Sequence, residues 1–202
     1  MTKDALAARL KHACAAVAAA EQELTEIDSR FGDADHGLTM AKIAGAISAA
    51  VDQSTGGIQA MLDDAAAAVM SLNGGSAVPL WNTWLDGMQE DAPQGGDIDV
   101  PGLQAVFARA LEELNDMSGA QVGDKTMMDA LIPASEAVAA YKGGDENELF
   151  AAAARAAMEG AEATRQYVSK FGRAKSYGEK TIGTPDAGAM SMSYFFQGLA
   201  RP

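Results

Sequence analysis

The sequence has few of the residues that build disulfides, zinc sites and sheets. Its 202 residues include one cysteine, so an intrachain disulfide and a cysteine-based zinc cluster are both excluded. Aromatic residues make up only 6% of the chain and β-branched residues are sparse. Alanine, the best helix former, occurs instead in long runs. The composition therefore favours an all-α fold.

Positive charge is also scarce. There are 15 Lys and Arg residues against 28 Asp and Glu residues, which gives a formal net charge of −13. Such a surface repels phosphate backbones, so nucleic acid is not expected as a partner, although bound metal ions still allow an acidic protein to take a nucleotide. No early segment resembles a signal peptide and no apolar run is long enough to span a membrane, so no membrane association and a cytoplasmic location are expected.

Apolar periodicity predicts about eight helices joined by short links. A stripe with 4-3-4-3 spacing from Leu6 to Ile27 indicates one long first helix. A second helix is expected over residues 38–52, and a third follows the break at 54–57 and ends at about 72. Further helices are expected around 80–88, over 103–114, 126–141 and 146–168, and around 190–199. Residues 171–186 are expected to be irregular. With no convincing strand, the pattern predicts one domain, residues 1–202, folded as an eight-helix antiparallel up-and-down barrel or bundle.

The densest chemical feature is the acidic segment DSRFGDADHG at residues 28–37. Asp28 follows the last apolar position of the first helix, and Asp33 and Asp35 lie two residues apart in the break, so the three carboxylates can converge. Converging carboxylates repel one another unless a cation lies between them, and hard oxygen ligands suit Mg²⁺ or Ca²⁺. The absence of EF-hand spacing favours Mg²⁺. A solvated turn with a helix cap is the alternative for so short a motif.

Three further features can serve a phosphate-bearing ligand. A helix that starts near Leu38 directs its backbone N–H groups toward whatever the aspartates hold. The segment NGGSAVP at residues 73–79 permits a close backbone approach, although a helix end followed by a turn explains it equally well. In residues 172–188, Arg173 and two lysines form a basic island that can clamp a polyphosphate or simply be a charged surface loop. Asp186 lies where it can cap the last helix.

Two other segments are less informative. Residues 123–126, GDKT, and 178–181, GEKT, end like a Walker A motif, but neither has the full spacing and no strand precedes them, so a P-loop is excluded. His36 is weak evidence by itself, because a lone histidine beside a turn is more often a structural hydrogen-bonding group. Its place between the aspartates and a helix start is compatible with a phosphate contact.

Four motifs, taken in order, resemble the L subunit of dihydroxyacetone kinases, or the equivalent C-terminal nucleotide-binding domain, over nearly the whole chain. They are residues 32–37 with Asp28 upstream, residues 74–80, residues 123–129 and residues 172–189. The resemblance implies an eight-helix barrel that binds ADP or ATP at one end. It also implies two Mg²⁺ ions that link Asp28, Asp33 and Asp35 to the phosphates. A separate K subunit would hold dihydroxyacetone or a similar short ketose covalently through a histidine.

The resemblance further assigns nucleotide contacts. The phosphates would be lined by His36, Gly37, Leu38, Thr39, Ser76 and Ala77. The adenine and ribose would lie near Gly119 and Met127, and the site would be closed by Arg173, the catalytic candidate, and by the turn Asp186, Ala187 and Gly188. The family has two phosphoryl sources, free ATP or a phosphoprotein of the sugar phosphotransferase system that recharges bound ADP, and the sequence does not choose between them.

The chain departs from the family pattern in several places. Thr39 stands where Asn is frequent, Ala77 and Val78 stand where Ser and Gly are usual, and the proline of an Asp-Pro-Gly turn is displaced to Pro185. The hydroxyl missing at Ala77 removes one candidate phosphate contact, worth about 0.5–1.5 kcal/mol. These departures keep open a non-catalytic nucleotide-binding regulator or interaction subunit. A metal-binding bundle with unrelated hydrolytic chemistry ranks last, because it leaves the third and fourth motifs unexplained.

Overall fold

A computed structural model describes residues 1–202, and its regular structure is helical. The α-helices are α1 (Lys3–Ala19), α2 (Glu21–Asp28), α3 (His36–Gln53), α4 (Ile58–Met70), α5 (Ala77–Glu90), α6 (Val100–Ser118), α7 (Met128–Ala140), α8 (Glu146–Ala163) and α9 (Ala187–Leu199), and the 3₁₀-helices are η1 (Thr164–Gln166) and η2 (Arg173–Thr181). The strand-like pairing is one isolated bridge between Thr2 and Asp97. The predicted all-α class is confirmed.

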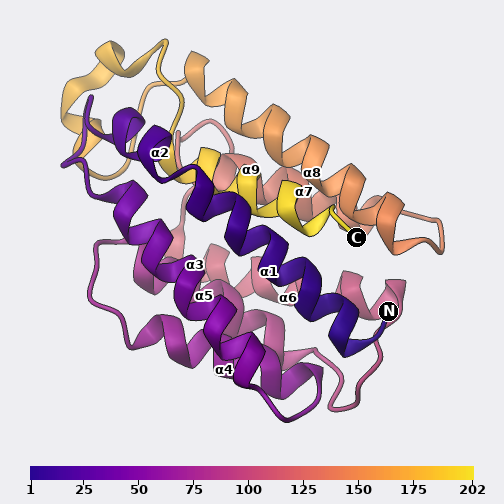
Figure 1. The fold of residues 1–202 in the computed structure, drawn as a ribbon. Coiled ribbons are helices and arrows are strands. Elements are labelled where there is room, and N and C mark those ends of the chain that lie inside the picture. Colours follow the sequence, from indigo (N-terminus) through magenta and orange to yellow (C-terminus); the bar gives the residue numbers. More distant parts are fainter.

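The helices close a ring in chain order. α1 packs on α3, each later helix packs on the next through α8 and α9, and α9 returns to α1. The short α2 continues from α1 and packs beside α3 and α9 (Figure 1). The predicted up-and-down barrel of eight helices is therefore confirmed if α1 and α2 are counted together as its first member.

The prediction of a single long first helix is wrong. α1 ends at Ala19 and α2 begins at Glu21, because the N–H of Ala20 bonds to the carbonyls of Val17 and Ala18 instead of continuing the four-residue ladder. The apolar stripe continues across this break, and Leu24 on α2 is fully buried. Periodicity alone therefore gave no sign of the change from one helix to two.

Two predicted boundaries near the C-terminal half are also wrong. α8 ends at Ala163 and not near Val168, because the chain tightens into η1 there. Residues 171–186, predicted as irregular, contain η2, which Gly178 interrupts with a φ of 56°. This positive φ of Gly178 is a conformation that glycine adopts at little cost. The remaining helix ends lie within a few residues of their predicted positions.

The core fills the ring with one cluster of 49 buried apolar residues. At its centre, aromatic side chains from α5, α6, α8 and α9 meet edge to face or tilted, with Trp81 and Phe195 at 5.2 Å between ring centroids and Trp84 and Phe195 at 5.4 Å. Such pairs add stabilisation beyond the burial of their area. None of the helices combines the length and the apolar character that a bilayer crossing needs.

The ring has two unlike ends. Because neighbouring helices alternate in direction, α3, α5, α7 and α9 all begin at one end, where the connections that precede them also lie. Figure 1 shows this end on the side of α2 and η2, with both chain termini toward the other side. The end where α3, α5, α7 and α9 begin is called the site end below.

Candidate functional site

A cavity of about 660 Å³ opens at the site end. Its walls include residues at the start of four helices, namely Asp35 and His36 of α3, Ser76 and Ala77 of α5, Met127 before α7, and Asp186 and Ala187 at α9. A helix N-terminus presents backbone N–H groups without intrahelical partners and the positive end of the helix dipole. Four of them around one cavity favour a negatively charged ligand.

Three of these N-termini, those of α3, α5 and α7, receive no capping hydrogen bond from the side chain of the residue before the helix. Neither the residue before α3, Asp35, nor the residue before α5, Ser76, accepts a capping hydrogen bond. By contrast, Asp186 Oδ2 accepts from Ala189 N at 2.8 Å, which confirms the predicted cap of α9. At the start of α7, Met128 N donates to Thr126 Oγ1, and in α5 Val78 N donates to Gly75 C=O at 3.2 Å while Pro79 has no N–H. The first N–H groups of α3 and the N–H of Ala77 are therefore the ones free to bind anionic oxygens.

The acidic segment brings its three carboxylates together beside the start of α3. One ligand oxygen from each of Asp28, Asp33 and Asp35 lies within 4.8 Å of the others. Gly32 allows this turn, because a Cβ there would lie 2.0 Å from Asp28 Oδ1. Burial, reinforced by the negative charges of Asp33 and Asp28, raises the pKa of Asp35. The cluster thus concentrates negative charge that a nearby cation can only partly offset, since the charge of Arg173 opposes but does not cancel the raised pKa of Asp35.

The carboxylates fit a hard divalent cation. Asp28 Oδ2 is buried and has no hydrogen-bond partner within the protein, and a buried oxygen of that kind is costly unless something binds it. The set consists of carboxylate oxygens, which suits Mg²⁺ better than the softer transition metals. Asp28, Asp33 and Asp35 are the residues that would hold such an ion. Whether the ion binds stays a prediction.

Arg173 crosses from η2 to the acidic segment. Its Nη2 lies 2.7 Å from Asp33 Oδ2, and the rings of Phe31 and Tyr177 meet nearby at 5.2 Å between centroids. Gly172, with a φ of 61°, makes the turn that starts η2. The basic island predicted from the sequence therefore faces the acidic cluster through Arg173.

His36, in the wall of the cavity, links α3 to α9. Its Nε2 lies 3.2 Å from Ser191 Oγ, and that hydroxyl donates in turn to Gly188 C=O at 2.9 Å. Burial lowers the pKa of His36, which favours the neutral form of the imidazole. A neutral ring adds no repulsion toward a bound cation and holds the starts of the two helices together.

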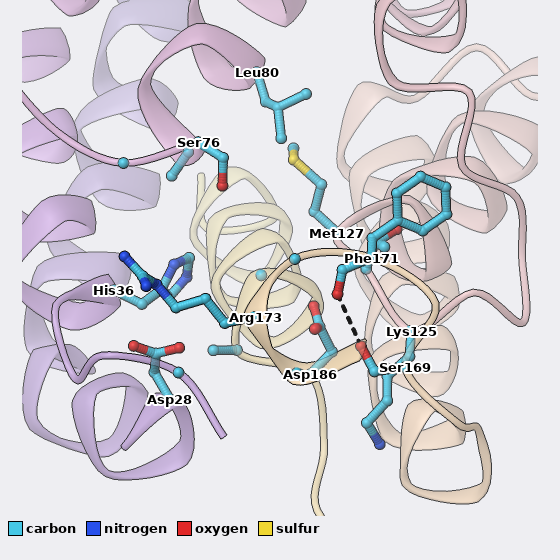
Figure 2. Close-up of a pocket in the computed structure, with 18 of the residues that line it drawn as sticks. Asp28, His36, Ser76, Leu80, Lys125, Met127, Ser169, Phe171, Arg173 and Asp186 are labelled. Atoms are coloured by element: carbon cyan, nitrogen blue, oxygen red, sulfur yellow. Dashed lines mark hydrogen bonds between the residues drawn. The ribbon is translucent and has the colours of Figure 1, made fainter. Parts of the chain in front are cut away.

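The cavity has a charged side and an apolar side. Figure 2 shows Asp28, His36 and the guanidinium of Arg173 together on one side, with Leu80, Met127 and Phe171 on the other. Asp186 lies between them, and burial raises its pKa to about 7. An elongated ligand with an anionic end and a flat apolar end matches this division.

Most of the predicted site residues line the cavity. They are Asp28, Asp33, Asp35, His36, Thr39, Ser76, Ala77, Met127, Arg173, Asp186, Ala187 and Gly188. Three predicted contacts do not line it: Gly37 packs against α2, where a Cβ would lie 2.0 Å from Glu21 O; Leu38 points to solvent; and Gly119 ends α6 with a φ of 64°. The neighbours of Gly119, Ser118 and Ala120, do line it. The roles of all these residues stay predictions.

Sequence reasoning missed several residues of the wall, including Leu80, Met117, Lys125, Ser169 and Phe171. Lys125 and Leu80 lie within the motifs at residues 123–129 and 74–80, but neither was assigned a ligand contact, and Met117, Ser169 and Phe171 lie in no motif. Asp129 of the same segment is fully buried and accepts from Gly123 N at 2.6 Å and Thr126 N at 2.7 Å, which fixes the turn before α7.

The sequence matches a family model described as the DAK2 domain over residues 30–201. The chain belongs to the DAK2 domain family. It is 38% identical over 183 residues to a D-erythrulose kinase of Mycolicibacterium smegmatis, covering 88% of this chain and 32% of that protein. It is 30% identical over 196 residues to the ADP-binding subunit DhaL of the PEP-dependent dihydroxyacetone kinase of Escherichia coli, covering 93% of this chain and 91% of that subunit.

A solved structure has the same fold. The dihydroxyacetone kinase of C. freundii, crystallised with AMP-PNP and Mg²⁺, superposes with a TM-score of 0.72 at 25% identity, covering 96% of this chain and 33% of that one. The chain thus spans about a third of the erythrulose kinases and of this dihydroxyacetone kinase, but nearly the whole of the ADP-binding subunit. The DAK2 domain occurs in these relatives either as part of a longer kinase or as a separate subunit.

Proposed function

We propose that this chain binds ADP or ATP together with Mg²⁺ and supplies the nucleotide to a kinase for a short ketose. The observation that carries the proposal is the convergence of three carboxylates and four helix N-termini on one cavity. The acceptor, dihydroxyacetone or a four-carbon relative such as erythrulose, is held by a separate K subunit or domain. The names of the relatives support this acceptor class.

The phosphates belong on the charged side of the cavity. The uncapped start of α3 and the N–H of Ala77 in α5 offer backbone donors there, and Thr39 and Ser76 add hydroxyls. Asp28, Asp33 and Asp35 hold Mg²⁺, in one or two ions, on the same side. When bound, Mg²⁺ neutralises phosphate charge and aligns the phosphate groups.

The nucleoside belongs on the apolar side. Leu80, Met127 and Phe171 form a surface that can cover a flat base (Figure 2). Asp186 and the first turn of α9 lie between the two sides, within reach of the ribose or the first phosphate. In this arrangement we propose that the transferable phosphate lies beside Arg173.

Arg173 is the proposed catalytic residue. Its guanidinium reaches the acidic cluster from η2, so a small rotation brings it against a phosphate oxygen held there. A guanidinium in that position stabilises the charge of a transferring phosphoryl group. The side chain is largely exposed, which leaves room for an acceptor brought by a partner.

The partner docks at the site end. All seven exposed large hydrophobic residues lie at that end, namely Leu38, Met70, Met117, Val122, Phe171, Tyr177 and Ile182. Exposed apolar side chains gathered around a cavity mark a protein interaction surface. A sugar-binding K subunit on this surface brings its ketose against the nucleotide and excludes water. A cytoplasmic location, where nucleotide and ketose meet, is part of the proposal.

A second candidate, a nucleotide-binding regulator without turnover, rests on Ala77, which stands where a phosphate-binding serine is expected. The second departure, Val78 in place of the usual glycine, gives this candidate little support. Val78 is buried and does not line the cavity. The nucleotide approach to α5 is therefore not narrowed by that side chain.

Reconstitution tests the proposal. The chain is mixed with a K subunit charged with dihydroxyacetone or erythrulose, and sugar phosphate is measured with ATP and with ADP plus the phosphorylated carrier protein of a sugar phosphotransferase system. Turnover with either donor supports the kinase role, and the active donor identifies the phosphoryl source. Nucleotide binding without turnover in both mixtures supports the regulator.

A further inference from the structure

Lys125 is a buried cation in the wall of the cavity. The residue is 4% exposed, and its Nζ donates to Thr164 C=O at 2.6 Å and to Thr184 C=O at 2.5 Å. Its backbone has a φ of 61°, in the left-handed region that residues other than glycine seldom occupy. A strained backbone and a desolvated ammonium are both costly, so the surrounding contacts must hold Lys125 in place.

The two carbonyls belong to segments that are distant in sequence. Thr164 ends α8, and Thr184 lies two residues before the cap of α9. Thr164 makes a second link to the same segment, because its Oγ1 accepts from Asp186 N at 2.8 Å. Lys125 and Thr164 together therefore fix the path of residues 184–186 and with it the position of Asp186.

This path decides how α9 meets the apolar side of the cavity. Asp186 caps α9. The first turn of α9 lies close to Met127, two residues after Lys125, because a Cβ at Gly188 would lie 3.3 Å from Met127 N. A shift of residues 184–186 thus changes the distance between Asp186 and Met127. These two residues border the space proposed for the nucleoside.

A direct phosphate contact by Lys125 does not fit its geometry. Two of its three N–H groups are used by carbonyls, and Figure 2 shows the amino nitrogen pointing away from the space between Arg173 and Met127. The carboxylates that act on its charge are Asp186, between the two sides of the cavity, and Asp129, buried at the start of α7, and not those of the acidic cluster.

We infer that Lys125 is a positioning residue for the nucleoside half of the ligand: it ties the end of α8 to the segment before α9 and so sets the spacing between Asp186 and Met127. The inference rests on the proposed function. It differs from the role of a Walker A lysine, which GDKT superficially suggests, because Lys125 acts through the protein and does not touch the phosphates.

Calorimetry on the intact chain separates these roles. ADP and inorganic pyrophosphate, each with Mg²⁺, are titrated into the wild type, Lys125→Met and a control, Lys142→Met, at an exposed position in the α7–α8 connection. Lys125→Met is expected to weaken ADP roughly tenfold or more, because residues 184–186 are then no longer held and Asp186 and Met127 lose their spacing, and to leave pyrophosphate binding within about twofold. The control is expected to match the wild type.

A second variant covers the case in which Lys125→Met does not fold. Thr164→Val removes the hydroxyl that accepts from Asp186 N but keeps the volume and the carbonyl that Lys125 binds. It is expected to weaken ADP by a smaller factor and again to spare pyrophosphate. Equal losses for ADP and pyrophosphate in a folded Lys125→Met make Lys125 a phosphate ligand and overturn the inference. Unchanged ADP binding in the folded variants also overturns it. A wild type that binds neither probe overturns the proposed function instead.

Discussion

Arg173 Nη2 lies 2.7 Å from Asp33 Oδ2, so the residue proposed to assist phosphoryl transfer is paired with a carboxylate of the proposed metal cluster. The Arg173 side chain is 71% exposed and the Asp33 side chain 42%, and ion pairs of such exposure contribute little to stability. The value of the pair therefore lies in where it keeps the guanidinium, over the mouth of the cavity, and not in the energy of folding.

Arg173→Gln is expected to impair transfer without impairing the fold. In the reconstituted kinase, kcat falls about 10²-fold or more, the usual effect of removing one charge-stabilising group, while KM for ATP changes far less. The melting temperature stays within about 2 °C of the wild type, because a surface pair is lost. Steady-state kinetics and thermal unfolding measure both. A melting temperature that drops in step with kcat contradicts this role.

The buried carboxylate oxygen of Asp28 predicts that Mg²⁺ with ADP stabilises the wild type but not the variant Asp28→Asn. Asp28→Asn removes a charge from a repelling cluster, so the metal-free variant is at least as stable as the wild type. Adding MgCl₂ with ADP raises the melting temperature of the wild type and leaves that of Asp28→Asn nearly unchanged, because a ligand stabilises only a fold that binds it.

Asp63→Asn is the control for this experiment, since Asp63 is exposed on α4, outside the cavity. It is expected to respond to MgCl₂ and ADP as the wild type does. A wild-type response that survives in Asp28→Asn shows that the cluster does not hold the metal.

Asp186 predicts a pH dependence of stability. Burial raises its pKa to about 7, whereas an unfolded Asp titrates near pH 4, so the folded chain binds more protons across that window. Stability supplied by this group is therefore full below about pH 4 and is lost as the pH rises toward 7. Burial also raises the pKa values of Asp129 and Asp35, which adds to the same trend.

Asp186→Asn isolates the contribution of this one carboxyl. Asn keeps an oxygen that can accept from Ala189 N, so the helix cap is preserved. The free energy of unfolding, measured in urea between about pH 4 and 8, is expected to fall less steeply with pH in Asp186→Asn than in the wild type. An identical slope in the two proteins means that Asp186 is ionised throughout this range.

The apolar surface at the site end predicts a separable docking function. Replacing Tyr177 and Ile182 together by Ser removes two exposed apolar side chains that do not line the cavity. The variant is expected to bind ADP with Mg²⁺ normally but to need a K-subunit concentration roughly tenfold or more higher for half-maximal turnover. Lys142→Ser, in the α7–α8 connection at the other end, serves as the control. An unchanged K-subunit requirement places the docking surface elsewhere.

The fold was predictable because its core positions repeat with helical spacing. Leu103, Val106, Phe107, Ala110 and Leu114 form one face of α6, and all are buried. The break at Ala20 was not predictable, since the same stripe runs through it and alanine suits either side. The 3₁₀ turns of η2 were missed for a related reason: short turns carry no apolar period.

The acidic half of the site was predictable because its residues are adjacent in sequence, whereas the apolar half comes from distant segments. Leu80, Met127 and Phe171 meet only once the ring closes. Lys125 shows a further limit: its partners, the carbonyls of Thr164 and Thr184, are backbone groups that leave no trace in residue identity. Leu38, predicted at the phosphates, points outward because the phase of α3 at its first turn depends on where the helix begins.

The central claim is that the aspartate cluster and the helix starts together bind a magnesium nucleotide. Calorimetric titration of ADP into the freshly purified and desalted chain, with and without Mg²⁺, tests it directly, with Asp33→Asn titrated alongside. The account predicts one ADP per chain in the presence of Mg²⁺, and strongly weakened binding without Mg²⁺ or in Asp33→Asn. Absence of binding in the presence of Mg²⁺, or binding that neither Mg²⁺ removal nor Asp33→Asn changes, would contradict it.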